Sequence, residues 1–241
     1  MVRIGLIGFG QQGKLYAGIL SGIPLPGMPP IPKPKDCVLT AVSARNEACH
    51  HLDLWLWLCG IPQSLYASCK EGAHRNIAVE NDVMVVAQYP NGSQGIFTTC
   101  SHDLLGTDRL EITFDKGKLI LEGNQKATVL RYTQPEGRFG ETYDFRSFYG
   151  VLMQSPEKIY QKEELTAKNA FCSDYVQMFQ NFAGYILRDE EPIAPAQAGL
   201  AQVQLANAIQ LSGWTGREVE LPCDEESYNF YLKKKIMEET K

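Results

Sequence analysis

Three glycines near the N-terminus are spaced for binding a phosphate group. Gly8, Gly10 and Gly13 follow an apolar run, residues 2–8, that reads as a buried strand, and they precede a helix-compatible stretch, residues 14–20. In this spacing the first glycine permits a tight turn, the second lets the backbone approach a pyrophosphate, and the third lets the helix lie close to the strand. The alternative is a glycine-rich turn without a ligand. The flanking pattern favours a dinucleotide site at a helix N-terminus, formed by Gly8, Phe9, Gly10, Gln11, Gln12 and Gly13.

A second group of candidate residues lies on one face of a predicted helix, residues 46–59. Asn46 stands four residues before His50 and Asp53 stands three after it, so one helical face carries all three. The rest of this helix is apolar, so it must be buried on most sides. Two interpretations follow: a capped helix start with a hydrogen-bonded core histidine, or a proton-handling cluster. In the second, His50 is the candidate general base, and Asn46 and Asp53 orient substrate hydroxyls or the imidazole ring.

The first elements of the chain limit how these residues can be held. Residues 22–35 carry six prolines, which exclude a helix or a central strand and predict an extended surface loop. Residues 36–43 then predict a second parallel strand. At its end, Ala44 and Arg45 stand where an acidic residue commonly binds the ribose hydroxyls, and an arginine there accommodates a 2′-phosphate. We therefore expect NAD or NADP as the cofactor, with Arg45 favouring NADP.

The remainder of the chain changes from a strand pattern to a helical one. Alternating apolar residues and hairpin turns, notably at residues 90–92 and 115–117, predict a meandering, mostly antiparallel sheet. Its expected strands span residues 64–69, 82–89, 93–100, 109–115, 118–122 and 127–132. Apolar residues at helical spacing then predict helices over residues 165–188 and 196–214. The pair Gly213 and Gly216 is expected to end the second helix, before a short strand at residues 218–221.

The composition bounds the classes of function. The chain has 241 residues, 23 Lys and Arg against 28 Asp and Glu, and a net charge of -5, which argues against a nucleic-acid partner. No apolar stretch approaches the length of a membrane span, and no export signal precedes the first strand. Seven cysteines without paired spacing indicate reduced thiols and a cytoplasmic location, and the spacing of Cys49, His50, His51 and Cys59 does not support a metal site.

Several stretches together resemble the glucose-fructose oxidoreductase, inositol dehydrogenase and MocA family of NAD(P)-dependent oxidoreductases. Residues 49–55, Cys-His-His-Leu-Asp-Leu-Trp, are similar to the helix that this family places beneath the nicotinamide, and residues 59–62, Cys-Gly-Ile-Pro, are similar to its usual ending. The family's sheet is matched by residues 79–82, 89–92 and 106–112, and its closing helix and tail by residues 205–214 and 221–224. The resemblance therefore reaches both ends of the chain.

The resemblance implies a dehydrogenase that transfers a hydride between a nicotinamide and a hydroxyl-bearing carbon of a sugar or cyclitol, with no metal. Two departures matter. The family usually has aspartate where this chain has Asn46, and the family's Glu-Lys-Pro motif has no counterpart in the chain. Two other classes therefore stay open: a non-catalytic protein that senses NAD(P) or a sugar and regulates a partner, and an interaction module built on the sheet.

The expected architecture is α/β plus α+β in two domains. Residues 1–45 would form a partial, Rossmann-like dinucleotide-binding domain, and residues 46–241 a domain with an open, mostly antiparallel sheet packed on helices. Two strands and one helix cannot bury their faces, so we expect about a hundred residues of a complete dinucleotide domain to be missing. We expect an unobserved segment, with a chain break between Ala44 and Glu47, rather than a true deletion. A homodimer or homotetramer through the sheet of residues 64–132 is expected, because exposed apolar sheet faces normally find a partner.

Overall fold

The structure is a computed structural model of the chain. It describes residues 2–7, 11–22, 32, 34–43, 50–74, 76–77, 79–123, 125–167 and 173–239. They divide into two compact units, one formed by Met1–Leu104 with Phe171–Lys241 and the other by Leu105–Ala170. The predicted domain boundary between residues 45 and 46 and the predicted chain break both lie outside the described residues, so both stay predictions.

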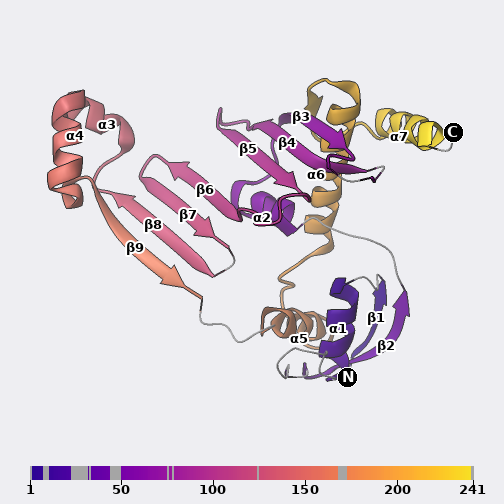
Figure 1. The fold of residues 1–241 in the computed structure, drawn as a ribbon. Helices are drawn as coiled ribbons and strands as arrows, with labels where there is room; N and C mark the ends of the chain where they lie inside the picture. The colour runs from indigo at the N-terminus through magenta and orange to yellow at the C-terminus, as the bar shows by residue number, and fades with distance from the viewer. Residues whose placement is uncertain are drawn as a thin grey trace. The chain divides into compact units, whose positions relative to one another are not determined.

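The N-terminal elements of the first unit form a strand, helix, strand sequence (Figure 1). Strand β1 (Val2–Ile7) pairs in parallel with β2 (Cys37–Ser43), in a register that runs from Val2 opposite Cys37 to Ile7 opposite Ser43. Helix α1 (Gln11–Ser21) lies between β1 and β2 in the sequence and contacts both strands. The parallel pair and the intervening helix confirm the elements predicted from the glycine motif.

Helix α5 (Ser173–Arg188), distant in sequence, completes the core of this part of the chain. Its buried side chains pack with those of β1 and α1, and the Tyr16 ring meets Phe179 edge-on at a centroid distance of 5.6 Å. The buried residues of this cluster are Val2, Ile19, Leu20, Val176, Phe179 and Ala183. Burial removes their apolar surface from water, so a helix from the C-terminal half stabilises the N-terminal elements.

A four-stranded antiparallel sheet forms the centre of the rest of the first unit. Its strand order is β10, β3, β4, β5, with bounds Val219–Glu220, Ser64–Glu71, Glu80–Gln88 and Gln94–Cys100. The β4–β5 hairpin turns at the predicted Pro-Asn-Gly sequence, where Gly92 has a φ of +83° that glycine adopts without strain. The predicted strands over residues 64–69, 82–89 and 93–100 are therefore confirmed.

Helices α2 (His50–Cys59) and α6 (Ala196–Thr215) belong to the same hydrophobic core as one face of this sheet. Side chains alternate along each strand, so every second residue points toward the helices. The buried members of this core are Leu52, Trp55, Leu65, Ala67, Val85, Ala87, Leu205, Ala208 and Ile209. The opposite face is open, and it exposes Tyr66, Met84, Val86 and Ile96. We call these four residues the open face of the sheet.

Gly213 lies inside α6, rather than ending it as predicted, and allows the helix to approach β3 closely. A Cβ atom at this position would lie 2.6 Å from the Cys69 Sγ and 2.8 Å from the Cys69 Cβ. The helix ends two residues later and is capped by Gly216, which has a left-handed φ of +64°. Close approach, and not helix termination, is therefore the requirement for glycine at position 213.

The G213A variant is expected to be less stable by about 1–3 kcal/mol, because the added methyl group must push α6 away from β3. The matched control is G199A in the same helix, where a Cβ would meet nothing within 4 Å. That control should be neutral or stabilising, because alanine is the better helix former. Urea unfolding followed by tryptophan fluorescence measures both, and equal midpoints for the two variants would contradict the packing argument.

The second unit contains a separate four-stranded antiparallel sheet in the order β6, β7, β8, β9. The strands span Arg109–Phe114, Gly117–Glu122, Lys126–Tyr132 and Tyr160–Thr166. Between β8 and β9 lie α3 (Glu136–Thr142), α4 (Phe145–Gln154) and the short 3-10 helix η1 (Pro156–Lys158). The single meander predicted over residues 64–132 is thus wrong in one respect: its six strands belong to two sheets.

The helix predicted from residue 165 is also wrong at its start. Leu165 and Thr166 belong to β9, where they pair with Ala127 and Lys126, and α5 begins at Ser173 in the described part of the chain. The sequence of β9 is charged and shows no strand alternation. Pairing with β8 and the Arg131–Glu163 ion pair, 3.4 Å between nitrogen and oxygen, hold it as a strand.

The last helix, α7 (Glu225–Glu239), is tied to the first unit by polar contacts. The Lys235 Nζ lies 2.7 Å from a Glu71 carboxylate oxygen, and the Tyr228 hydroxyl donates to the Gln210 side chain at 2.8 Å. The Tyr228 ring also stacks on Trp214 at 5.5 Å.

Within the residues described, no helix has the length and apolar character needed to cross a membrane.

Candidate functional site

Helix α2 carries two of the predicted acid–base residues, His50 and Asp53, one helical turn apart. Leu52 and Trp55 are buried against the sheet, and the Trp55 ring stacks on Phe97 at 5.6 Å. His50 is the first residue of this helix, and Asp53, one turn later, has an exposed side chain. Because a residue turns about 100° around the helix, positions 50 and 53 share the side opposite Leu52 and Trp55. Which of the two interpretations of His50 holds stays a prediction, because its side chain lies outside the described part of the chain.

Trp57 lies on the same side of α2 and was not singled out from the sequence. Its side chain is 79% exposed, whereas Trp55, two residues earlier, is 6% exposed. Positions 50, 53 and 57 follow helical spacing. We call these three positions the outer face of α2. Trp57 lies seven residues after His50, and this helical spacing could have revealed it. An aromatic residue in an apolar helix is, however, usually interpreted as part of the hydrophobic core.

The glycine motif has the flanking elements that dinucleotide binding requires. Strand β1 ends at Ile7, and α1 begins at Gln11, so Gln11, Gln12 and Gly13 form the first turn of the helix. This turn contains no acidic residue, so nothing in it opposes an anion at the positive end of the helix. Gly8, Phe9 and Gly10 lie outside the described residues. The strand and the helix are confirmed, and the phosphate contact itself stays a prediction.

The other predicted site residues cannot be placed. Asn46, Ala44 and Arg45 lie outside the described residues, so their roles in orienting substrate and in selecting NADP stay predictions. The structure brings His50 and Asp53 together on one helix.

A second polar cluster, which the sequence did not indicate, brings together His74, His102 and Asp82. The two imidazole rings lie 4.9 Å apart, and the His102 Nε2 is 3.7 Å from an Asp82 carboxylate oxygen. The loop before β4 is held by the buried Asn81, whose side chain bonds the backbone N–H and carbonyl of Ala73 at 2.7 Å each. Asp82 is on β4, on the same side of the sheet as the open face.

The histidine cluster and the half-buried Cys69 contain other titratable groups. In the described residues, no group of three His, Cys, Asp or Glu side chains is arranged to hold a metal ion. Burial, with the nearby Glu80 and Glu71, raises the pKa of the Cys69 thiol to about 11, so it is protonated at neutral pH and is a poor nucleophile. Burial also raises the pKa of Tyr89 to about 12.

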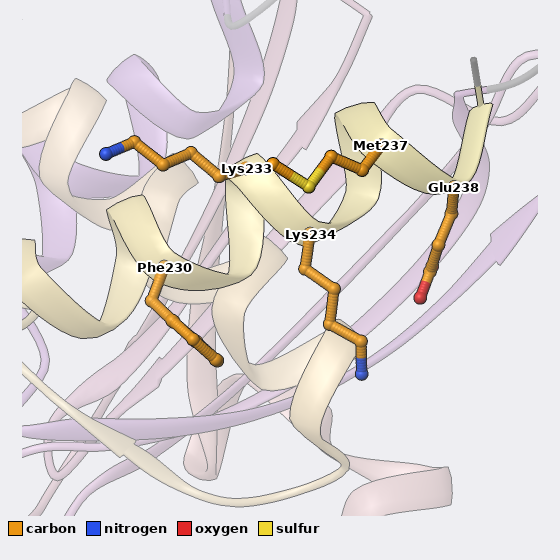
Figure 2. A pocket seen from close by; sticks show the side chains of 5 residues that line it. All are labelled: Phe230, Lys233, Lys234, Met237 and Glu238. Carbon is orange, nitrogen blue, oxygen red and sulfur yellow. The ribbon is translucent and has the colours of Figure 1, made fainter.

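A shallow hollow on α7 is likewise separate from the candidate site. Figure 2 shows its lining, and all of it comes from this one helix: Phe230, Lys233, Lys234, Met237 and Glu238. Phe230, Lys234 and Glu238 follow one another along one side of the helix. The hollow mixes both signs of charge around two exposed apolar side chains, which gives it no particular chemistry. The outer face of α2 therefore remains the candidate site.

Comparison with known proteins identifies a matching family model and several similar solved structures. The GFO/IDH/MocA C-terminal domain matches residues 43–120, which include α2, the strands β3 to β6 and the first part of β7. Among solved structures, the WlbA dehydrogenase from Bordetella pertussis, in complex with NADH and UDP-GlcNAcA, is 19% identical with a TM-score of 0.51, over 73% of this chain and 46% of that one. An NAD binding oxidoreductase from Klebsiella pneumoniae is 15% identical with a TM-score of 0.53, over 73% and 49%.

A third structure, the aldose-aldose oxidoreductase from Caulobacter crescentus complexed with glycerol, is 15% identical with a TM-score of 0.51, over 70% of this chain and 44% of that one. No curated protein matches the chain. The chain thus spans about half the length of these solved structures, and at such identities the likeness concerns the fold.

The mixed α/β architecture, with antiparallel sheets packed on helices, is therefore the fold of this class of oxidoreductases. Residues 43–120 match the C-terminal domain of the GFO/IDH/MocA family. The family predicted from the residues of α2 and the sheet is confirmed.

Proposed function

We propose that the protein is an NAD(P)-dependent oxidoreductase that acts on a hydroxyl-bearing carbon of a sugar or cyclitol. The observation that carries this proposal is the outer face of α2, on which positions 50 and 53 lie one helical turn apart and Asp53 is exposed, inside the matched domain. Two of the similar structures contain NADH or are described as NAD binding, and one contains a sugar nucleotide. These likenesses support a nicotinamide cofactor and a sugar-like substrate.

In the proposed reaction, His50 removes the proton of the substrate hydroxyl while the same carbon gives up a hydride, which leaves a carbonyl. Asp53 and Asn46 orient the hydroxyls that flank the reacting carbon. A bound nicotinamide would supply the hydride acceptor. The reacting carbon must lie within about 3–3.5 Å of the acceptor, so positioning by these side chains is the main contribution of α2.

The first turn of α1 is proposed to hold the cofactor's pyrophosphate. Gln11, Gln12 and Gly13 present backbone N–H groups at the helix N-terminus, which has no acidic residue to repel the phosphates. Arg45, without a carboxylate beside it in the sequence, favours the 2′-phosphate of NADP.

Nicotinamide reduction, followed at its absorbance band across a panel of sugars and cyclitols, tests this function beside a titration of NAD and NADP. Turnover with at least one member of the panel is expected. Tight cofactor binding without turnover of any member would instead favour the second candidate, a sensor of NAD(P) or sugar, which is motivated by Asn46 in place of the usual aspartate. The intact mass of the purified protein tests whether a further segment exists. A mass of about 27 kDa would support a true deletion, and a mass nearer 40 kDa would support an additional segment.

We further propose that the protein self-associates through the open face of the sheet. Ile96 is 77% exposed and Met84 58% exposed, on adjacent strands of the face that α2 and α6 do not cover. The register places Tyr66, Val86 and Ile96 in one row across the sheet. Apolar side chains in such a row lose contact with water when a second copy covers them.

The I96E variant is expected to be monomeric at concentrations where the unmodified chain is a dimer or tetramer, because a carboxylate in a covered apolar face is costly. The matched control is F230E on α7, which changes an exposed apolar residue outside this face. Light scattering after size exclusion measures both masses. A monomeric unmodified chain, or an I96E variant with the mass of the parent, would refute the interface.

A further inference from the structure

One buried asparagine sets the spacing of the histidine cluster. Asn81 is 5% exposed, and its side chain bonds the backbone N–H and carbonyl of Ala73 at 2.7 Å each. Its backbone carbonyl accepts the N–H of Ser101 at 2.9 Å. Ala73 and Ser101 each precede a histidine of the cluster, His74 and His102, by one residue. Asn81 therefore determines how close the two imidazole rings lie.

The His102 ring presents a buried nitrogen that has no hydrogen-bond partner. Its Nε2 atom is buried and forms no hydrogen bond within the described part of the chain. The Asp82 carboxylate lies 3.7 Å away, which is too far for a hydrogen bond but close enough for an ion pair. A proton taken up by His102 places a cation beside this carboxylate, which favours the charged ring. The geometry thus suits the uptake of one proton.

A second proton, on His74, has the opposite effect. The ring centroids are 4.9 Å apart, so two protonated rings place like charges next to each other. Asp82 is one carboxylate and offsets one of the two charges. His74 also has a left-handed φ of +56°, which a residue other than glycine adopts at a cost. The contacts of Asn81 must therefore hold this segment against charge repulsion as well as backbone strain.

The neighbouring strands and segments add charges of both signs. The strand register places Lys70 of β3 and Cys100 of β5 directly opposite Asp82. Asp103 and Arg75 each follow a histidine of the cluster in the sequence, and Arg75 lies outside the described residues. These two cations and two carboxylates balance in number, so protons on the histidines supply the net charge of this region. Two further carboxylates are engaged elsewhere: Glu71 contacts Lys235 of α7, and Glu80 accepts a hydrogen bond from Gln210 of α6.

We propose that the histidine cluster makes the contact between Asn81 and Ala73 dependent on pH. The cluster tolerates one proton beside Asp82, whereas a second proton drives the two rings apart and releases Ala73 from Asn81. Imidazoles gain their protons between about pH 8 and 5, so the release follows a fall in pH through this range. Asp82 lies on the same side of the sheet as the open face, so the release changes the surface at the end of that face. This inference is independent of the reaction proposed for α2.

Amide hydrogen exchange at Ala73, resolved by NMR, tests this proposal. The Ala73 N–H is protected only while it donates to the Asn81 side chain, so its protection factor measures the contact. Between about pH 7.5 and 5.5, and after correction for the intrinsic rate of exchange, this protection is expected to fall about tenfold. The reference within the same molecule is Ala67, whose N–H donates to the buried Ser212 hydroxyl at 2.8 Å and should keep its protection within about twofold.

The H74N variant identifies the charge that is responsible. It removes one of the two cations, and asparagine tolerates the left-handed backbone of this position. Protection of Ala73 should then change by no more than about twofold over the same pH range. H102Q removes the other cation and should give the same result, which keeps the test available if H74N is unfolded. The matched control is H51N on α2, an exposed histidine outside the cluster, in which the fall at Ala73 should persist.

The D82N variant tests the sign of the effect. It removes the carboxylate that offsets the first proton, so the fall in protection should be larger and should begin at higher pH. The proposal is overturned if Ala73 keeps its protection at about pH 5.5, if the fall persists in both H74N and H102Q, or if D82N reduces it. It is also overturned if Ala67 loses protection to the same extent, because the whole sheet would then open rather than this one contact.

Discussion

The H50A variant is expected to turn over its sugar or cyclitol about 10²–10⁴ times more slowly than the unmodified protein, because the hydroxyl proton loses its acceptor. Position 50 is the first residue of α2, whose buried residues are Leu52 and Trp55, so the substitution is expected to leave the core intact. The loss should therefore appear in kcat, while the unfolding midpoint stays close to that of the parent. Stopped-flow reduction of the nicotinamide measures the rate.

The neighbouring histidine supplies the control for this experiment. His51 is exposed and lies about 100° around the helix from His50, away from Asp53. H51A should keep most of the activity. If H50A retains the parent's turnover, or if H51A loses as much as H50A, the general base lies elsewhere and the role of the outer face of α2 must be revised.

The largest expected effect on stability is that of L205A. Leu205 is 0% exposed and joins α6 to the buried face of the sheet, in the core that also contains Trp55 and Val85. Its truncation leaves a cavity between elements that cannot fully collapse, and it should cost about 2–5 kcal/mol of unfolding free energy. The expected readout is a lower urea midpoint with an unchanged slope.

L200A in the same helix is the matched control, because Leu200 is 60% exposed. It should change stability by no more than about 0.5 kcal/mol. Tryptophan fluorescence reports on the correct unit, since Trp55, Trp57 and Trp214 all lie in the first unit and residues 105–170 contain none. Equal destabilisation by the two variants would mean that α6 does not pack on the sheet through Leu205.

Local signals predicted most of the strands. The β4–β5 hairpin follows from Pro-Asn-Gly between two alternating runs, and the β6–β7 hairpin follows from Asp-Lys-Gly, with Gly117 at a φ of +156° where a Cβ would meet the Leu130 carbonyl. Turn residues and apolar alternation act over a few positions, so they can be recognised in the sequence without knowledge of the rest of the fold.

The predictions failed where long-range contacts decide the structure. Strand β9 is exposed along most of its length and is paired only at its β8 edge in the described residues, so its sequence lacks the apolar alternation of a half-buried strand. The sequence also gives no signal for the separation of the strands into two sheets. Strand propensity does not depend on which strand pairs with which, so the pairing is known only from the tertiary structure.

The sequence by itself determined the chemistry that this protein can hold: three glycines at phosphate-binding spacing, and a histidine and an aspartate one helical turn apart. Both are local patterns, fixed by the turn of the backbone. The tertiary structure alone decided that α5 packs on α1, that the outer face of α2 includes Trp57, and that His74 and His102 meet beside Asp82. Hydrophobic packing is non-directional, so which distant faces meet is settled only when the whole chain buries its apolar surface.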